Sequence, residues 1–172
     1  HSGHVVGDNL WIWRADHAVL GLEEASNYPH ISPIFWQSEQ HEYRAETGLQ
    51  VTGDDVTVYG LAVEHADGHQ TVWSGERGSV AFYQCEFPYG VTEDFGANEY
   101  RGYLVTENVV DHEVFAPGVY SNFRNAPVQV STAIEHPVTS GVRVVNPFTV
   151  KLDNLGGILS VANSKGSAAT RK

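Results

Sequence analysis

The amino-acid sequence predicts an all-β fold, and more specifically a right-handed parallel β-helix that forms part of a longer solenoid. Strand-forming residues dominate, and Gly and Pro interrupt every apolar stretch before a helical period of 3.6 residues can develop. A short strand motif also recurs along the chain. The Asn-Gly and Asp-Gly turns that antiparallel hairpins favour occur once, at Asp67-Gly68. A β-sandwich built from hairpins is therefore the alternative fold.

The repeated unit is a small or acidic pair followed by a short alternating apolar strand. Its five copies start at Asp8, Asp54, Gly78, Glu107 and Ser140. From the second copy onward, the starts lie about 24 to 33 residues apart. This spacing falls within the period of about 20 to 50 residues that marks solenoids and related arrays.

Stacked repeats of this kind place successive strands side by side in parallel sheets. We expect strands to begin near five apolar residues: Leu10, Val56, Val80, Val109 and Val142. The alternation of side chains along a strand predicts that Val58, Phe82 and Val144 point into the core. It also places Trp11 and Trp13 on one face of the first strand, and we expect that face to be the core.

The sequence is interpreted as a single β-helix domain over residues 1–163, with a flexible tail at 164–172. A stretch around 18–48 is rich in Pro and aromatic residues, which favours an inserted loop. The first coil shows no obvious polar cap before Asp8. Exposed strand edges associate readily, so we expect an upstream β-helix segment or another chain to pack on this coil.

Composition limits the partners of this chain. Of its 172 residues, 41% are hydrophobic and 18% charged, which is enough apolar material for a core. The net charge of −11 argues against nucleic acid or an anionic membrane surface, because both require basic patches. No run of about 18 apolar residues could span a bilayer, and the single cysteine, Cys85, excludes an intrachain disulfide. A neutral polysaccharide remains open as a partner.

Two carboxylates, Glu64 and Glu86, occupy the ends of neighbouring repeats. They lie one coil apart in the predicted solenoid, so both side chains can project from the same edge. Paired carboxylates are the usual apparatus of glycoside hydrolysis. The aromatic neighbours Phe82, Phe87 and Tyr89 would raise the pKa of Glu86 by excluding water, as a proton donor requires. The alternative interpretation is that both are ordinary acids at strand edges.

Three segments resemble a known enzyme family. These segments are Val58–His65, which ends in Glu-His, Phe82–Tyr89, which contains Gln-x-Glu-x-Pro-Tyr, and Gly118–Phe123, which reads Gly-x-Tyr-Ser-x-Phe. In order and spacing they are similar to the second β-helix of glycoside hydrolase family fifty-five, the exo-acting β-1,3-glucanases. The resemblance covers about residues 54–125 and implies a pectin-lyase-like fold.

The resemblance also implies an inverting hydrolysis in which Glu86 is the general acid and Glu64 its neighbour at the site. The residues that we expect to contact substrate are Gln84, Tyr89, His65, Trp36 and Tyr120. Enzymes of this family are much longer and hold part of the attacking water on another β-helix. The resemblance therefore implies that another β-helix completes the active site.

Nine histidines raise the question of a metal site. An N-terminal His1 with His4 nearby could suggest a copper-binding histidine brace, which combines a free amino terminus with two imidazoles. Proteins with that brace are sandwiches, whereas the repeat from Asp8 onward indicates a solenoid. We therefore expect neither a metal site nor another cofactor.

Two functions follow from these patterns. The first is an extracellular, glycoside-hydrolase-like module that acts on or binds β-1,3-glucan-type polysaccharide. The second is a non-catalytic extracellular module that has a structural or carbohydrate-binding role in a larger assembly. Hydrolysis of a soluble β-1,3-glucan by the chain would separate the first from the second.

Overall fold

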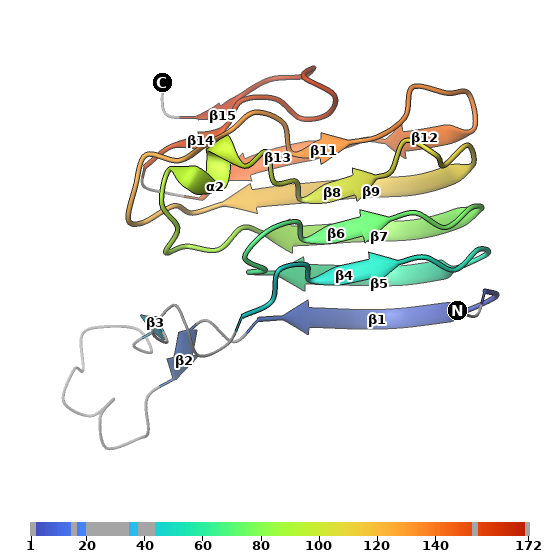
Figure 1. The fold of residues 1–172 in the computed structure, drawn as a ribbon, viewed down its shortest axis with the longest axis horizontal. Helices are drawn as coiled ribbons and strands as arrows, with labels where there is room; N and C mark the ends of the chain where they lie inside the picture. The colour runs from blue at the N-terminus through green and yellow to red at the C-terminus, as the bar shows by residue number, and fades with distance from the viewer. Residues whose placement is uncertain (1–2, 15–16, 20–34, 38–43, 153–154, 171–172) are drawn as a thin grey trace.

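Successive strands lie side by side and run in the same direction in the computed structural model, which describes residues 3–14, 17–19, 35–37, 44–152 and 155–170 (Figure 1). The largest sheet has the strand order β1-β5-β7-β9-β12, with β13 also on β9, and all of these neighbours are parallel. Its strands are β1 (Val6–Trp13), β5 (Thr57–Glu64), β7 (Gly78–Glu86), β9 (His112–Ser121), β12 (Val142–Val145) and β13 (Phe148–Lys151).

A second parallel sheet, in the order β11-β8-β6-β4, forms another wall of the molecule. Its strands are β4 (Leu49–Val51), β6 (Thr71–Trp73), β8 (Tyr103–Val105) and β11 (Ile134–Glu135). A third sheet contains β10 (Gln129–Val130), β14 (Gly157–Ile158) and β15 (Ala169–Thr170). The remaining elements are the antiparallel pair β2 (His17–Val19) and β3 (Phe35–Gln37), and the short helix α2 (Asp94–Ala97).

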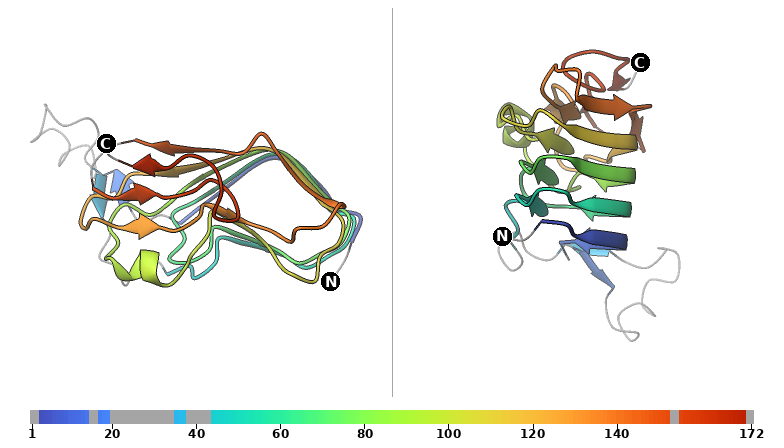
Figure 2. Two further views of the ribbon diagram at one scale, coloured as in Figure 1. Left: turned by 90° about the horizontal axis from the view of Figure 1, so that it is seen from above. Right: turned by 90° about the vertical axis from the view of Figure 1, so that its right-hand side faces the viewer.

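The chain passes from one sheet to the other in each repeat, and the repeats overlie one another when viewed from above (Figure 2). The fold is all-β with stacked parallel sheets, which is consistent with a parallel β-helix. The parallel pairing does not support a β-sandwich made of hairpins. All five expected strands begin within four residues of the predicted positions, with Val109 in the turn three residues before β9 begins at His112.

Large apolar and aromatic side chains from both sheets fill the space between them. The largest fully buried side chains include Trp73, Tyr83, Tyr103, Phe87, Phe123 and Leu61. The tyrosine hydroxyls inside the coil have partners: Tyr83 donates to the Gly102 carbonyl at 2.7 Å, and Tyr103 shares a hydrogen bond of 3.0 Å with the His112 ring. These two buried hydroxyls are thus paired within the core, as their desolvation requires.

Each long strand of the main sheet contains a bend, and the bends lie in one row. The residues at this position have positive φ angles of 48° to 67°: Asn9, Gly60, Phe82 and Ala116 within β1, β5, β7 and β9, and Asn146 between β12 and β13. A left-handed residue breaks the simple alternation of sides along the strand. The buried side chains of β5 are accordingly Val58, then Leu61 and Val63.

This bend explains why one sequence prediction is wrong. Val58 is buried and Val144 packs against the core as expected, but the Phe82 side chain is 60% exposed. Strict alternation from Val80 would place Phe82 inside. The left-handed conformation at Phe82 turns that side chain outward and gives the inward position to Tyr83 instead.

The expected core position of Trp11 and Trp13 is also wrong. Trp11 is 67% exposed and Trp13 is 37% exposed, whereas Ile12 between them packs against the core. Register gives the reason, because Ile12 lies opposite the buried Val63 while Trp13 lies opposite Glu64. The two indole rings stack on the outer face with their centroids 5.9 Å apart.

Most of the predicted inserted loop at 18–48 lies outside the described residues. The predicted C-terminal tail contains β15, whose residues Ala169 and Thr170 pair antiparallel with β14. This part of the tail is therefore hydrogen-bonded to a sheet. Within the described part of the chain, no helix is both long enough and apolar enough to span a membrane.

Candidate active site

The carboxyl-terminal halves of β1, β5, β7 and β9 place the predicted acids on one outer face. Register aligns Trp13, Glu64, Glu86 and Tyr120 in a single row across the four strands. The parallel row two residues earlier contains Trp11, Ala62, Gln84, Gly118 and Phe148. These two rows bring together most of the residues that the sequence singled out.

Glu64 and Glu86 lie directly opposite each other on neighbouring strands. Adjacent strands are about 4.8 Å apart, so the two carboxyl groups share one small region of the surface. The register of β5 and β7 thus brings together two acids that lie one coil apart, as the sequence predicted. Both project to the same side of the sheet, and neither faces the other across an open cleft.

The pKa of the Glu86 carboxyl is raised, and burial is the largest cause. A hydrogen bond with Tyr89 and the charges of His65 and Arg124 act in the opposite direction, whereas the charge of Glu64 raises the pKa further. One carboxyl oxygen, Oε1, is buried and has no hydrogen-bond partner among the described residues. Burial without full pairing favours the protonated form of this group.

Tyr89 is the aromatic neighbour that encloses Glu86. The Phe87 ring does not do so, because it points into the core on the other side of the strand and is fully buried. The Tyr89 ring contacts the His65 ring at a centroid distance of 4.5 Å, and the Arg124 guanidinium lies 4.1 Å from the Tyr89 ring centre. Glu86, His65 and Tyr89 therefore form one connected group.

Trp11 and Trp13 belong to this site, although the sequence analysis assigned them to the core. The Trp11 indole N–H donates to Glu64 Oε2 at 2.9 Å, which fixes the orientation of that carboxylate. Their outward direction could have been recognised from the residues between them, because Leu10 and Ile12 continue the inward-facing apolar positions of β5. The tryptophans then take the outer side of the strand. Indole rings exposed beside a carboxylate are suited to stacking on sugar rings.

A second aromatic pair stands on the other side of the acids. The Tyr120 and Phe148 rings contact each other edge to face at 6.1 Å. Phe148 covers Gly118, where any β-carbon would overlap the phenyl ring. Short side chains at Ala62 and Gly118 thus separate the two aromatic pairs, and Gln84 lies between them.

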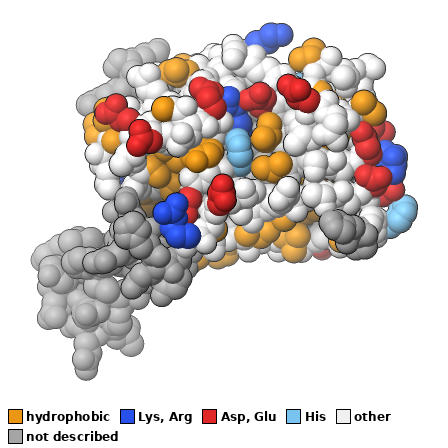
Figure 3. All heavy atoms as spheres, viewed as in Figure 1, with side chains coloured by type: hydrophobic (Ala, Val, Ile, Leu, Met, Phe, Trp, Pro, Cys, Tyr) orange, Lys and Arg blue, Asp and Glu red, His pale blue; other side chains and the backbone are white. Residues whose placement is uncertain are grey.

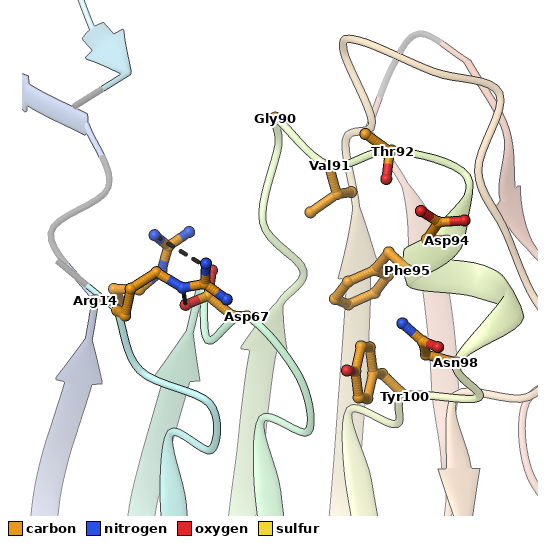
Figure 4. Close-up of a pocket in the computed structure, with 10 residues that line it drawn as sticks. Arg14, Asp67, Gly90, Val91, Thr92, Asp94, Phe95, Asn98 and Tyr100 are labelled. Carbon is orange, nitrogen blue, oxygen red and sulfur yellow. Dashed lines mark hydrogen bonds and ion pairs between the residues drawn. The ribbon is translucent and has the colours of Figure 1, made fainter. Parts of the chain in front are cut away.

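A cavity of 230 Å³ lies beyond the ends of these strands (Figure 4). Figure 4 shows Arg14 and Asp67 on one side of it and Asp94, Asn98 and Tyr100 on the other. Arg14 and Arg44 both form ion pairs with Asp67, at 3.5 Å and 2.9 Å. Neither Glu64 nor Glu86 lines this cavity.

The other predicted site residues are placed as follows. Trp36 lies in β3, opposite Ala18, and its side chain is outside the described part of the structure. His1 is also outside it, and the largely exposed His4 forms an ion pair with Asp55 at 3.7 Å. Across the described residues, no three His, Cys, Asp or Glu side chains gather as a metal ion would require. Cys85 is buried, and burial raises the pKa of its thiol.

Acidic side chains dominate the charged surface of the molecule. Figure 3 shows many more Asp and Glu than Lys and Arg on the face it presents, with hydrophobic side chains between them. This distribution agrees with the 21 acidic and 10 basic residues of the chain. A neutral ligand would meet no electrostatic barrier at such a surface, whereas a polyanion would be repelled.

Comparisons with known proteins agree with this geometry. A family model described as the LAM55 pectate lyase-like domain matches residues 1–86, which is half of the chain. An exo-beta-1,3-glucanase from Streptomyces sp. (strain SirexAA-E / ActE) is 30% identical, over 96% of this chain and 26% of that protein. The chain therefore spans about a quarter of the length of this relative.

Solved structures give the same result. The structure of sacteLam55A from Streptomyces sp. SirexAA-E matches with a TM-score of 0.78 and 30% identity, over 99% of this chain and 29% of that one. A glutamate-to-alanine variant of sacteLam55A in complex with glucose matches with a TM-score of 0.77, over 98% and 28% of the two chains. The similarity extends well beyond the expected residues 54–125. The chain belongs to the LAM55 pectate lyase-like domain family.

Proposed function

We propose that this chain is a glycoside hydrolase module that acts on β-1,3-glucan-type polysaccharide, with Glu86 as the general acid. The observation that carries the proposal is the partly buried Glu86 carboxyl, with its raised pKa, directly opposite Glu64 on an aromatic surface. A carboxyl group that stays protonated near its working pH can donate to a glycosidic oxygen. The relatives described as exo-beta-1,3-glucanase and in complex with glucose support this choice of substrate.

We propose separate roles for the two acids. In an inverting hydrolysis the proton donor and the base act on opposite faces of the sugar ring, with their carboxyl groups about 6.5 to 9.5 Å apart. Glu64 and Glu86 project from neighbouring strands to the same side, so they cannot flank a sugar ring. Glu64 therefore acts beside Glu86, where its negative charge favours the protonated form.

The attacking water must then approach from the side of the sugar that faces away from this sheet. The row that holds Glu64 and Glu86 continues with Trp13 and Tyr120, so it contributes no further carboxylate. We propose that a second β-helix supplies this part of the site. The fraction of the relatives that this chain covers, 26% to 29%, leaves room for such a segment.

The first coil offers a surface on which that segment can pack. Among the described strands, β1 stands at the end of the main sheet and pairs with β5 alone. Val5 and Leu10 are exposed there, and they border an open cavity of 320 Å³ that also reaches Val56. We propose that residues 1–163 form one domain of a longer right-handed solenoid, and that a further β-helix segment covers this end.

Secretion is part of the proposal, because polymeric glucan is encountered outside the cell. A non-catalytic structural or carbohydrate-binding module is the second candidate function. The feature that favours it is the absence, among the described residues, of a base on the far side of the sugar. In that case the aromatic surface would bind glucan without cleaving it.

The test compares Glu86→Gln with the parent chain. Gln keeps the shape and hydrogen bonding of Glu but has no acidic proton, so hydrolysis of laminarin should fall by a factor on the order of 10² to 10⁴. Binding should change by no more than a few-fold. Glu107→Gln, which removes a charge from an exposed site away from the acids, is the control and should keep full activity.

Two outcomes would overturn the proposal. Unchanged hydrolysis by Glu86→Gln would remove this residue from the mechanism. Saturable laminarin binding without sugar release, even by the parent, would assign the chain to the second candidate function.

A further inference from the structure

We propose that Tyr59, Phe82 and Phe115, which we name the bend aromatics, form a second platform for a β-glucan chain. The platform lies on the face that carries Glu86, on the far side of the strand bends. This inference rests on the proposed function, because it assumes that the ligand of Glu86 is a glucan. It adds a binding site for a remote part of the same polymer.

The three side chains are exposed to an unusual degree for their size. Phe82 is 60% exposed, Tyr59 is 53% exposed and Phe115 is 40% exposed. Register places Tyr59 and Phe115 on either side of Ala81, and Phe82 follows Ala81 on the central strand β7. The bend aromatics therefore come from three adjacent strands and form one surface.

The residues between these rings are small, whereas Tyr59 lies opposite Asp8 and Phe115 opposite Val145 on their outer sides. Phe82 lies between Gly60 and Ala116 in the row of bends, and Ala81 separates the other two rings. None of the three rings packs against another aromatic ring in the described part of the chain. Their flat faces are thus available to a ligand, and exposed apolar surface of this kind marks binding sites.

Phe82 also has a backbone conformation that its side chain disfavours. Its φ angle is 65°, in the left-handed region that Asn and Gly tolerate and bulky residues rarely adopt. Equivalent positions in other coils hold Asn9, Gly60 and Asn146, which suit this conformation, and the small Ala116. A phenylalanine that is both strained and exposed contributes nothing to the core, so its side chain is best explained by a contact outside the chain.

The surroundings favour a sugar chain over a protein partner. Thr57 and Ser79 lie opposite each other on the same outer face, two residues before Tyr59 and Ala81, and provide hydroxyl groups beside the rings. An aromatic face next to hydroxyls matches the apolar C–H face and polar rim of a pyranose.

The platform is continuous with the proposed active site. Phe82, Gln84 and Glu86 follow one another along β7, all on the outer face. Four residues of strand separate Phe82 from Glu86 by about 13 Å. A short run of sugar residues spans this distance, so one glucan chain can contact the bend aromatics while its end lies at Glu86.

The test measures binding of laminarin and of short laminari-oligosaccharides to Phe82→Asn and Tyr59→Ser by isothermal titration calorimetry. Asn suits the backbone of position 82, so Phe82→Asn should fold and be at least as heat-stable as the parent. Its dissociation constant for laminarin should rise on the order of 3- to 10-fold, and the loss should increase with chain length. Val110→Ser, which alters an equally exposed residue (61%) outside the platform, should bind like the parent.

The outcomes are distinguishable from failure of the proposed function. A parent chain that binds no glucan would overturn the proposed function, and the platform with it. Parent-like binding by both variants, with binding by the parent intact, would overturn the platform alone. A change in sedimentation without a change in affinity would also overturn it and assign the bend aromatics to a contact between chains.

Discussion

The interior of the coil and its outer face each contain one titratable group that is shielded from water. The inner group affects stability, and the outer group affects the proposed chemistry. Inside, His112 is fully buried beside Trp73 and Tyr103, and burial lowers its pKa to about 4. Outside, burial raises the pKa of the Glu86 carboxyl. In both places burial favours the neutral form.

The difference lies in what can reach each group. His112 is enclosed by the core, so its protonation can only oppose folding. Glu86 lies on the outer face beside Trp13, Glu64 and Tyr120, where a ligand can take up the proton that the carboxyl retains. The same desolvation therefore limits stability at one position and supports chemistry at the other.

The largest expected effect concerns stability in acid. The pKa of His112 falls from 6.5 to about 4 on folding, so the unfolded chain binds a proton more readily than the native one. The contribution of neutral His112 to the free energy of unfolding is complete above pH 6.5. Protonation of the unfolded chain removes about 3 kcal/mol of that free energy as pH falls from 6.5 toward 4. Denaturant unfolding of the parent and of His112→Gln at pH 7, 5.5 and 4 measures this loss.

His112→Gln cannot be protonated, so its stability should fall less between pH 7 and pH 4 than that of the parent. His4→Gln, at a largely exposed histidine, should follow the parent at every pH. Equal slopes for the parent and His112→Gln would mean that His112 does not titrate in this range.

The next effect tests how tightly the interior is packed. Gly78 lies against the indole ring of the fully buried Trp73, and a β-carbon at this position would overlap that ring. Gly78→Ala should therefore reduce the free energy of unfolding by about 1 to 3 kcal/mol, the usual cost of overpacking. Val110→Ser, at an exposed position, should change it by less than about 0.5 kcal/mol in a urea titration. A neutral Gly78→Ala would show that Trp73 can move away.

The sequence was sufficient to predict the parallel stacking and the meeting of Glu64 with Glu86, because both depend on a repeat of about one coil. It did not predict which side chains face outward. One left-handed residue per long strand, at positions such as Asn9 and Phe82, shifts the alternation, and a phenylalanine gives no local signal for that conformation.

The same limit affected the aromatic part of the site. Trp11 and Trp13 are typical core residues by composition, and only their register with Ala62 and Glu64 places them outside. The contacts of Tyr89 with His65 and Arg124 join residues from three coils, so no local pattern could indicate them.

A smaller effect is expected for Tyr89→Phe, which probes the hydrogen bond on the outer face. The Tyr89 hydroxyl lowers the pKa of Glu86, so removing it should raise that pKa further. If Glu86 is the general acid, the alkaline limb of the pH profile of kcat/KM should move to higher pH, while kcat at the optimum falls less than about tenfold. Carbon-13 NMR titration of the Glu86 carboxyl gives the same answer without relying on activity. A shift to lower pH in both measurements would contradict the assignment.

The smallest effect is a gain in stability from Glu86→Gln. A carboxyl whose pKa is raised on folding destabilises the native state in its charged form, and this cost is present when the pH exceeds the folded pKa. Glu86→Gln should therefore raise the Tm at pH 7 by up to a few °C, and the gain should shrink as pH falls through the folded pKa and disappear below about 4.5. Differential scanning calorimetry at pH 7 and pH 4, with Glu107→Gln as control, measures it. A lower Tm for Glu86→Gln at pH 7 would mean that Tyr89, His65 and Arg124 stabilise the carboxylate more than burial destabilises it, which would remove the basis for a proton donor at this position.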